Sequence, residues 1–252
     1  MPLKTIIFQS QAKSNMQPWV EACLETVRIW ATQTSVDYQF LGDEIFEFVP
    51  EYLRYKFKDQ PVILTDLARL RLLNSALNDA YDRAVWIDAD LLVFNPYALD
   101  LIKAFHAVGR EVWVQKAGSQ LKVYRKVHNA FLMGTKDDSF LPFYADAAET
   151  MLRRAEGPLV PQFIGPKLLT AQHNITALHV QESVGMVSPL ALRDALNGGG
   201  PALDLTLAGH ERGLDAVNLS ASLLGIKSDE VCHGEADYEK FIEQTLSAGF
   251  LK

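Results

Sequence analysis

The stretch Ala84-Val-Trp-Ile-Asp88-Ala-Asp90-Leu-Leu-Val-Phe-Asn95-Pro96 decides the fold. Its first four residues are apolar and predict a short buried strand, and two carboxylates separated by one residue follow it. Because alternate residues of an extended chain point to the same side, Asp88 and Asp90 can jointly hold a hard divalent cation through oxygen ligands. We expect Asn95 and Pro96 to turn the chain into a helix.

Strand and helix patterns alternate on both sides of this stretch. Apolar and β-branched runs predict strands at residues 4–9, 36–41, 84–87, 111–115 and 129–134. Apolar residues spaced three to four apart predict helices at residues 18–32, 66–77 and 139–154. This alternation is typical of an α/β fold with a mainly parallel sheet flanked by helices. We expect one domain, residues 1–197, with a C-terminal extension, residues 198–252, packed on it after the break Gly198-Gly-Gly-Pro201.

Composition excludes several classes of protein. Of the 252 residues, 48% are hydrophobic and 22% charged, so the chain can bury a sizeable core and is not of the disordered type. Its 24 basic and 31 acidic residues are mixed along the chain and give a net charge of −7, which disfavours nucleic acid as a partner. Cys23 and Cys232 are expected to be free thiols. No apolar run is long enough for a membrane span or a signal peptide, so we expect a cytoplasmic protein.

A bare Asp-x-Asp pair carries little information. The chain has 17 aspartates, so about one such pair is expected by chance. The context is more informative, because an apolar strand precedes the pair and Leu91-Leu-Val-Phe94 follows it. Adjacent carboxylates in an apolar segment repel each other and lose hydration unless a cation or hydrogen-bond donors are present. The context therefore favours a functional site over ordinary turn chemistry.

The segment Tyr81–Val93 resembles the strand and metal motif of nucleotide-sugar glycosyltransferases of the GT-A fold. The nearest resemblance is to glycosyltransferase family 32, the sugar-binding region containing a DxD motif, and to related retaining families. Four further segments match in the same order and extend the resemblance over about residues 5–175: Ile6–Gln9, Thr65–Arg69, Asn129–Gly134 and Ile164–Thr170. Residues 66 and 69 are one turn apart, which places them on one helix face. The chain departs from the family at Phe8, where a histidine is common, and in lacking a Gly-Gly before the metal strand.

The resemblance implies roles for individual residues. Asp88 and Asp90 would bind Mn²⁺ or Mg²⁺, with His210 as a late third ligand. Three other histidines are the alternatives: His173, His179 and His233. The expected catalytic residues are Asp66, Arg69, Asp88 and Asp90. The expected donor-binding residues are Gln9, Asp66, Arg69, Ala89, Asn129, Gly165 and Pro166.

The activity implied by the resemblance is transfer of a hexosyl-type sugar from a nucleotide-diphosphate sugar, with UDP-sugars expected first and GDP-sugars second. The acceptor would be a glycan or a lipid-linked saccharide, as in polysaccharide biosynthesis, and peripheral membrane association stays open. Charge that develops on the diphosphate would be stabilised by the metal on Asp88 and Asp90 and by the Arg69 guanidinium. Asp66 would orient the donor sugar through its hydroxyls. Related families retain the anomeric configuration, often without an identifiable protein nucleophile, and we assign none.

Two competing functions and one further surface stay open. A phosphatase of the haloacid dehalogenase type also uses Asp-x-Asp with magnesium, but its pair lies on the first strand and has Thr or Val where this chain has Leu92. A non-catalytic relative would bind a nucleotide sugar without turnover. The segment Ile45–Lys58, rich in aromatic and charged residues, is expected to pack on the sheet as a helix or loop. Its alternative is an acceptor, membrane-surface or partner patch around Tyr52 and Tyr55.

Overall fold

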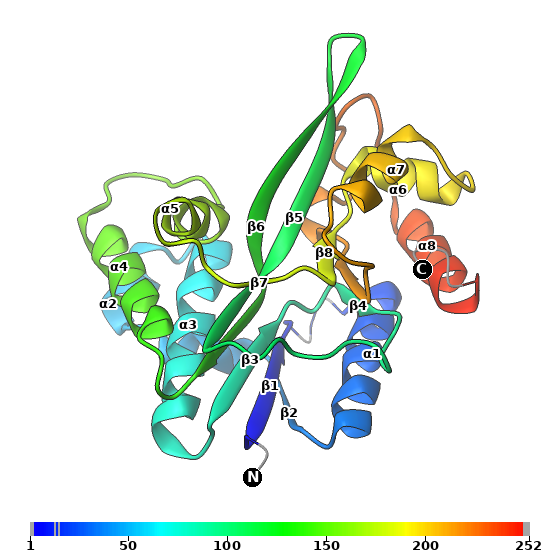
Figure 1. Ribbon diagram of the computed structural model, residues 1–252. Coiled ribbons are helices and arrows are strands. Elements are labelled where there is room, and N and C mark those ends of the chain that lie inside the picture. Colours follow the sequence, from blue (N-terminus) through cyan, green and yellow to red (C-terminus); the bar gives the residue numbers. More distant parts are fainter. Residues whose placement is uncertain (1–2, 13, 15, 249–252) are drawn as a thin grey trace.

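The computed structural model describes residues 3–12, 14 and 16–248, and it shows a mixed sheet flanked by helices (Figure 1). Within these residues the central sheet has six strands in the order β2-β1-β3-β6-β5-β7. They are β1 (Thr5–Ser10), β2 (Asp37–Leu41), β3 (Arg83–Ile87), β5 (His106–Ala117), β6 (Gln120–Thr135) and β7 (Val180–Gln181). Three of the five pairings between these described strands are parallel, which confirms the predicted α/β class with a mainly parallel sheet.

Helices cover both faces of the sheet. They are α1 (Pro18–Thr34), α2 (Glu51–Lys56), α3 (Pro61–Asp79), α4 (Phe140–Arg154) and α5 (Pro166–Thr176). Along β1, Ile6 and Phe8 join the core cluster formed with α3 and α4, whereas Ile7 joins the cluster formed with α1. The period-two pattern of this strand therefore buries both of its faces, as expected in the middle of an α/β sheet.

β5 and β6 form a long antiparallel hairpin that projects beyond the rest of the sheet (Figure 1). The two short strands predicted at residues 111–115 and 129–134 are only parts of it. The turn at its tip contains Gly118 with φ of +65°, a left-handed conformation that favours glycine. Many side chains near the tip are exposed, so this half of the hairpin lacks the apolar run by which a buried strand is detected.

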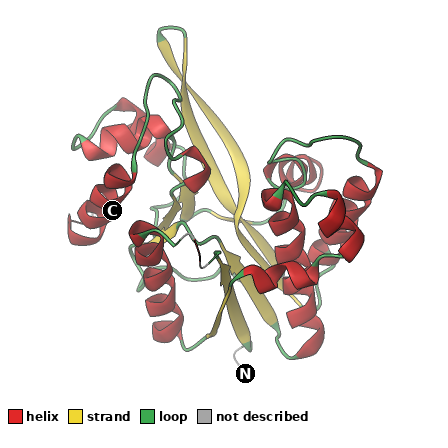
Figure 2. Cartoon of the chain, turned by 180° about the vertical axis from the view of Figure 1, so that it is seen from behind, coloured by secondary structure: helices red, strands yellow, loops and turns green. Residues whose placement is uncertain are grey.

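A smaller sheet joins the middle of the chain to its C-terminal part. β4 (Leu91–Val93) pairs with β9 (Ala216–Asn218), which also pairs with β8 (Val184–Met186). The helices around it are α6 (Pro189–Leu196), α7 (Pro201–Ala208) and α8 (Glu235–Ala248). Trp19 of α1 stacks on Tyr238 of α8 with ring centres 4.8 Å apart. Figures 1 and 2 show these helices on the opposite side of the hairpin from α4 and α5.

The helix predicted after Asn95 and Pro96 does not form. The backbone N–H groups of Phe94 and Asn95 both donate to the carbonyl of Asp215, and the Asn95 side chain donates to the Asp215 carboxylate at 2.8 Å. Pro96 also disfavours the helical conformation for Asn95, the residue before it. The chain instead makes a turn here and continues to β5.

The aromatic segment Ile45–Lys58 forms helices whose buried residues join the core cluster that also contains Ile6 and Phe8 of β1, so it packs on the sheet as predicted. It comprises most of the 3₁₀ helix η2 (Asp43–Phe48), followed by α2. Ile45 is buried in the core cluster that includes α3. The Tyr52 hydroxyl donates to the Glu149 carboxylate of α4 at 3.1 Å.

Cys23 and Cys232 are both free thiols, the first buried and the second exposed. In the described part of the chain, no helix combines the length and the apolarity needed to cross a bilayer.

Candidate functional site

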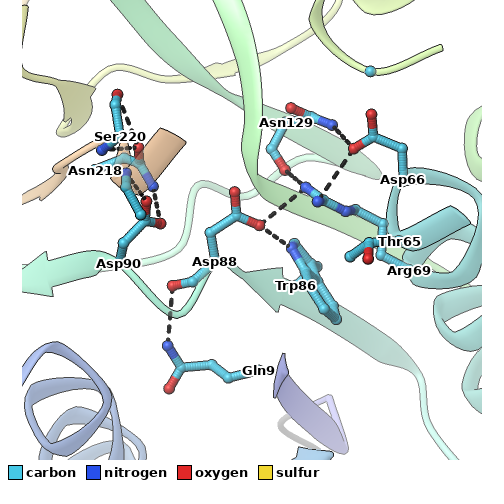
Figure 3. Close-up of polar contacts among 12 residues, drawn as sticks. Gln9, Thr65, Asp66, Arg69, Trp86, Asp88, Asp90, Asn129, Asn218 and Ser220 are labelled. Atoms are coloured by element: carbon cyan, nitrogen blue, oxygen red, sulfur yellow. Dashed lines mark hydrogen bonds and ion pairs between the residues drawn. The ribbon is translucent and has the colours of Figure 1, made fainter. Parts of the chain in front are cut away.

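Asp88 and Asp90 lie at the carboxyl end of β3, in the middle of the sheet (Figure 3). The N–H of Asp88 donates to the Ala130 carbonyl on β6 at 2.8 Å, so the pairing of the strands reaches this residue. The side-chain amide of Gln9 donates to the Asp88 carbonyl at 3.1 Å. In open α/β sheets, ligands bind beyond the carboxyl ends of the strands. The fold therefore places both carboxylates where a ligand site is expected.

Two donors fix the side chain of Asp88. The indole N–H of Trp86 donates to Asp88 Oδ1 at 2.6 Å, and the Arg69 guanidinium lies 3.0 Å from the same oxygen. Trp86 reaches the carboxylate because it precedes Asp88 by two residues, so both side chains leave the chain on the same side. No hydrogen bond joins Asp88 Oδ2 to another described residue, and the side chain is 25% exposed. One carboxylate oxygen is thus available to a ligand.

Arg69 is a buried cation at the centre of the site (Figure 3). From α3 it contacts Asp66 at 3.1 Å and Asp88 at 3.0 Å, and it donates to the Asn129 carbonyl at 2.9 Å. Its guanidinium also lies 5.0 Å from the centre of the Trp86 ring. Burial disfavours the charged form, but the charges of Asp88 and Asp66 outweigh burial and raise the pKa of Arg69. The site therefore holds a fixed positive charge.

Asp66 lies on α3 one turn before Arg69 and lines the same site. Its Oδ1 accepts a hydrogen bond from Asn129 Nδ2 at 2.8 Å. Burial raises the pKa of Asp66 to about 6, with Arg69 opposing this shift and Asp88 adding to it. Gly165 lies just before α5 and lets this segment approach Asp66 closely, because a Cβ at this position would overlap Asp66 Oδ2.

Asp90 is held by the C-terminal part of the chain. Its Oδ1 accepts from Asn218 Nδ2 at 2.6 Å, and its Oδ2 accepts from the Ala221 N–H at 2.7 Å. Asn218 ends β9, and its Oδ1 accepts from the Ser220 N–H at 2.9 Å. Burial and then the neighbouring Asp88 charge raise the pKa of Asp90 to about 6, although the two donors oppose the shift. Asp90 therefore carries a charge that its surroundings only partly stabilise.

These residues share a cavity of about 1010 Å³. Six of the predicted site residues line it: Asp66, Arg69, Asp88, Asp90, Asn129 and Pro166. Its volume is at the upper end of the range for small-molecule sites, about 300 to 1,000 Å³. The other walls come from the β5–β6 hairpin, from the segment around the start of α5 and from the loop after β9.

Three residues predicted to bind the donor lie outside the cavity lining. Gln9 is fully buried, and its amide is engaged with the Asp88 carbonyl and, at 3.1 Å, with the Tyr38 hydroxyl. The Gln9 side chain is therefore engaged within the fold and does not line the cavity. Ala89 is packed in the core formed by α1 and the C-terminal helices. Gly165 acts on the site through its close approach to the Asp66 side chain.

The structure does not bring His210 to the two carboxylates. Its Nδ1 lies 3.0 Å from the Glu182 carbonyl, and its ring packs against Gly185 on β8. Among the described residues, no three His, Cys, Asp or Glu side chains form a cluster that could hold a metal ion. Two other residues from the late part of the chain reach the Asp90 carboxylate, Asn218 through its side chain and Ala221 through its N–H. The three alternative histidines belong to no such cluster within the described ranges either: His173, His179 and His233.

Sequence analysis missed two residues that build the site. Trp86 was assigned only to the apolar strand, although its place two residues before Asp88 is a signal that an indole N–H can reach that carboxylate. Asn218 is separated from Asp90 by 128 positions, and no local pattern connects them. Only the pairing of β9 with β4 brings this amide to the site.

No protein-family model matches this chain, and no curated protein matches it. Among solved structures it is similar to a glycosyltransferase involved in the glycosylation of the major capsid of PBCV-1, with a TM-score of 0.48 and 11% identity over 95% of this chain and 98% of that one. It is also similar to the galactosyltransferase LgtC in complex with donor and acceptor sugar analogues, with a TM-score of 0.48 and 11% identity over 95% of each chain. A Drosophila β-galactosyltransferase 7 in complex with manganese, UDP-Gal and xylobiose has a TM-score of 0.33 and 13% identity over 70% of this chain and 63% of that one.

Proposed function

We propose that this protein is a metal-dependent glycosyltransferase whose donor is a nucleotide-diphosphate sugar, with a UDP-sugar expected first and a GDP-sugar second. The observation that carries the proposal is the placement of Asp88, Asp90 and the buried cation Arg69 in one cavity at the carboxyl end of β3. A diphosphate leaving group needs a cation beside its oxygens and fixed positive charge to stabilise it. A glycan or lipid-linked acceptor, retention of configuration and a cytoplasmic location belong to the same proposal.

The donor set fits Mn²⁺ or Mg²⁺ shared with a substrate. Asp88 Oδ2 accepts no hydrogen bond from the described residues, and each Asp90 oxygen accepts one from them, which leaves lone pairs for a cation. Mg²⁺ is usually held by one or two carboxylates together with substrate phosphates and water. The site therefore needs no third protein ligand such as a histidine. When bound, the metal supplies Lewis-acid stabilisation of the leaving diphosphate.

The chain's own residues bind and orient the donor. Arg69 is held by two carboxylates, a carbonyl and an aromatic ring, so its charge is already in place when negative charge develops on the diphosphate. Asp66 Oδ2, which accepts no hydrogen bond from the described residues, can accept one from a hydroxyl of the donor sugar. Asn129 keeps Asp66 in this orientation through the hydrogen bond to Oδ1. The sugar is thereby positioned for attack on its anomeric carbon.

The test is a thermal-shift panel of nucleoside diphosphates and nucleotide sugars with and without manganese. It compares the parent with the double variant Asp88→Asn/Asp90→Asn and with Asp59→Asn, a control at an exposed aspartate. A ligand at 100 times its Kd stabilises a fold by about 2.7 kcal/mol, which raises the melting temperature measurably. We expect metal-dependent stabilisation by one nucleotide in the parent and the control, and none in the double variant.

Release of nucleotide from the sugar donor then distinguishes an enzyme from a binding protein. Stabilisation without release in the presence of acceptors would favour the non-catalytic relative. No response to any nucleotide, together with hydrolysis of an aryl phosphate, would replace the proposal with the phosphatase.

A further inference from the structure

One face of the β5–β6 hairpin lines the part of the cavity that extends away from Asp88 and Asp90. From β5, Glu111, Trp113 and Gln115 line it, and their side chains share one face because they alternate along the strand. Val112 and Val114 point to the other face and are buried. The hairpin is therefore fixed from behind and presents a defined polar and aromatic face to the cavity.

Two aromatic residues are cross-strand neighbours on this face. Trp113 and Tyr124 are direct partners in the register of the hairpin, which places their Cβ atoms about 5 Å apart. Trp113 is only partly buried. The other three tryptophans of the chain are each 1% exposed: Trp19, Trp30 and Trp86. Both rings line the cavity. An aromatic ring of this kind offers a large rigid apolar surface with a polar tip, which is suited to binding amphipathic ligands.

Charged groups flank the rings, and two lysine ammonium groups lie over the Tyr124 ring, Lys122 Nζ at 4.8 Å and Lys126 Nζ at 5.5 Å from its centre. Glu111 Oε1 and Lys126 Nζ lie 4.0 Å apart, so their charges compensate each other. The Gln115 amide lies 3.4 Å from the Tyr124 hydroxyl. Among the described residues no lysine or arginine lies over the Trp113 ring, so this ring and the polar groups beside it suit a saccharide, which presents C–H groups on one face and hydroxyls along its rim.

The loop after β9 closes the opposite wall of this part of the cavity. Leu223 and Ile226 from this loop line the same cavity. Further along the loop, Asp229 accepts from the Lys116 N–H near the hairpin tip at 3.1 Å, and Glu230 forms an ion pair with the Lys116 ammonium. These bonds hold the loop against the hairpin. The outer cavity is therefore a groove with two walls.

The positions of Tyr124 and Ala130 along β6 show how far this groove extends from Asp88. Asp88 is bonded to Ala130, and Tyr124 precedes Ala130 by six residues. At about 3.3 Å per residue, the backbone of Tyr124 lies about 20 Å along the strand from that of Ala130. A donor sugar beside Asp88 cannot span this distance, so the rings face a different ligand or a remote part of one.

We propose that the outer cavity is an acceptor subsite for an oligosaccharide, in which a sugar unit remote from the reacting one stacks on Trp113, beside Tyr124. The inference rests on the proposed glycosyl transfer and narrows its acceptor to a saccharide chain of several units. The reacting unit of the acceptor then lies at the inner end of the groove, beside Asp88.

The test is binding of the full chain to an array of defined di-, tri- and tetrasaccharides. Trp113→Ala removes the stacking surface, and Trp113→Phe restores a ring. Tyr97→Ala is the matched control, because Tyr97 is 87% exposed and does not line the cavity. We expect the parent, Trp113→Phe and Tyr97→Ala to bind the same oligosaccharides, and Trp113→Ala to bind them at least tenfold more weakly. Melting temperatures establish that each variant is folded.

Two results would overturn the subsite: equal binding by Trp113→Ala, or no saccharide bound by the parent. Nucleotide binding by the parent, measured in parallel by thermal shift, separates this inference from the proposed function. Trp113-dependent saccharide binding without any nucleotide response would support the groove as a saccharide site and overturn the transferase. A nucleotide response without Trp113-dependent saccharide binding would overturn the subsite alone.

Discussion

The substitution Asp66→Asn changes one buried charge and almost no volume, so its effect can be worked out from the electrostatics of the site. Burial raises the pKa of Asp66 to about 6 in the fold, whereas an aspartate in an unfolded chain has a pKa of about 3.9. Because the folded-state pKa is the higher one, the free energy of unfolding falls as the pH rises from about 4 through about 6. A difference of about 2 pKa units at about 1.36 kcal/mol each corresponds to about 3 kcal/mol.

Asparagine at this position keeps the hydrogen bond with Asn129 but cannot ionise, so the variant avoids this loss of stability. The free energy of unfolding of Asp66→Asn minus that of the parent should therefore increase by about 3 kcal/mol between about pH 4 and about pH 7. Urea denaturation at a series of pH values measures this difference, with Asp59→Asn as a control for the loss of one formal charge. A difference that stays constant with pH would refute burial as the main influence on Asp66. A gain in stability accompanied by a loss of nucleotide-sugar turnover would show that the carboxylate serves the ligand and not the fold.

Burial lowers the pKa of His128 to about 3, so the unfolded chain takes up a proton below about pH 6.5 that the fold excludes, and stability falls with falling pH. His128→Gln should reduce the loss of unfolding free energy between about pH 7 and about pH 5 by about 2 kcal/mol in urea denaturation, and an unchanged pH profile would contradict this. Trp86→Phe keeps the ring beside Arg69 but deletes the donor to Asp88, so it should cost about 1 kcal/mol of stability and weaken metal-dependent nucleotide binding in thermal shifts. Equal nucleotide binding by parent and variant would show that Arg69 alone holds Asp88. Gly165→Ala should displace the Asp66 side chain and reduce turnover on the order of 10²-fold, measured as nucleotide release, and full activity would mean that the wall yields without moving Asp66.

Local patterns located much of the fold because they report burial directly. The period-two run of β1 and the three-to-four spacing of α1 and α3 each mark faces that the sheet and helices bury. The same patterns placed Asp66 and Arg69 on one helix face and Asp88 at a strand end, and the structure brings all three together. The outer half of the hairpin was missed because exposed strand residues carry no apolar signal.

Sequence patterns could not predict contacts between residues that lie far apart in the chain. The partners of Asp90 depend on β9 lying beside β4, and nothing near Asp90 in the sequence indicates Asn218. His210 was chosen by its place late in the chain, yet its ring turns to the Glu182 carbonyl. The prediction of a helix after Asn95 was wrong because this turn depends on a distant residue. Asp215 accepts hydrogen bonds from the N–H groups of Phe94 and Asn95 and from the Asn95 side chain.

The position of β9 also has a consequence for the order in which the chain acquires its function during synthesis. The donors to Asp90 come from residues 128 and 131 positions later, so the ribosome has added most of the C-terminal part before this carboxylate gains its partners. Contacts of such high sequence separation form late and slow the folding of a domain. The first strands and helices can assemble earlier around their own core, since domains emerge and fold from the N-terminus. A nascent or prematurely terminated chain that lacks β9 and the residues after it would thus leave the Asp90 carboxylate without these two donors.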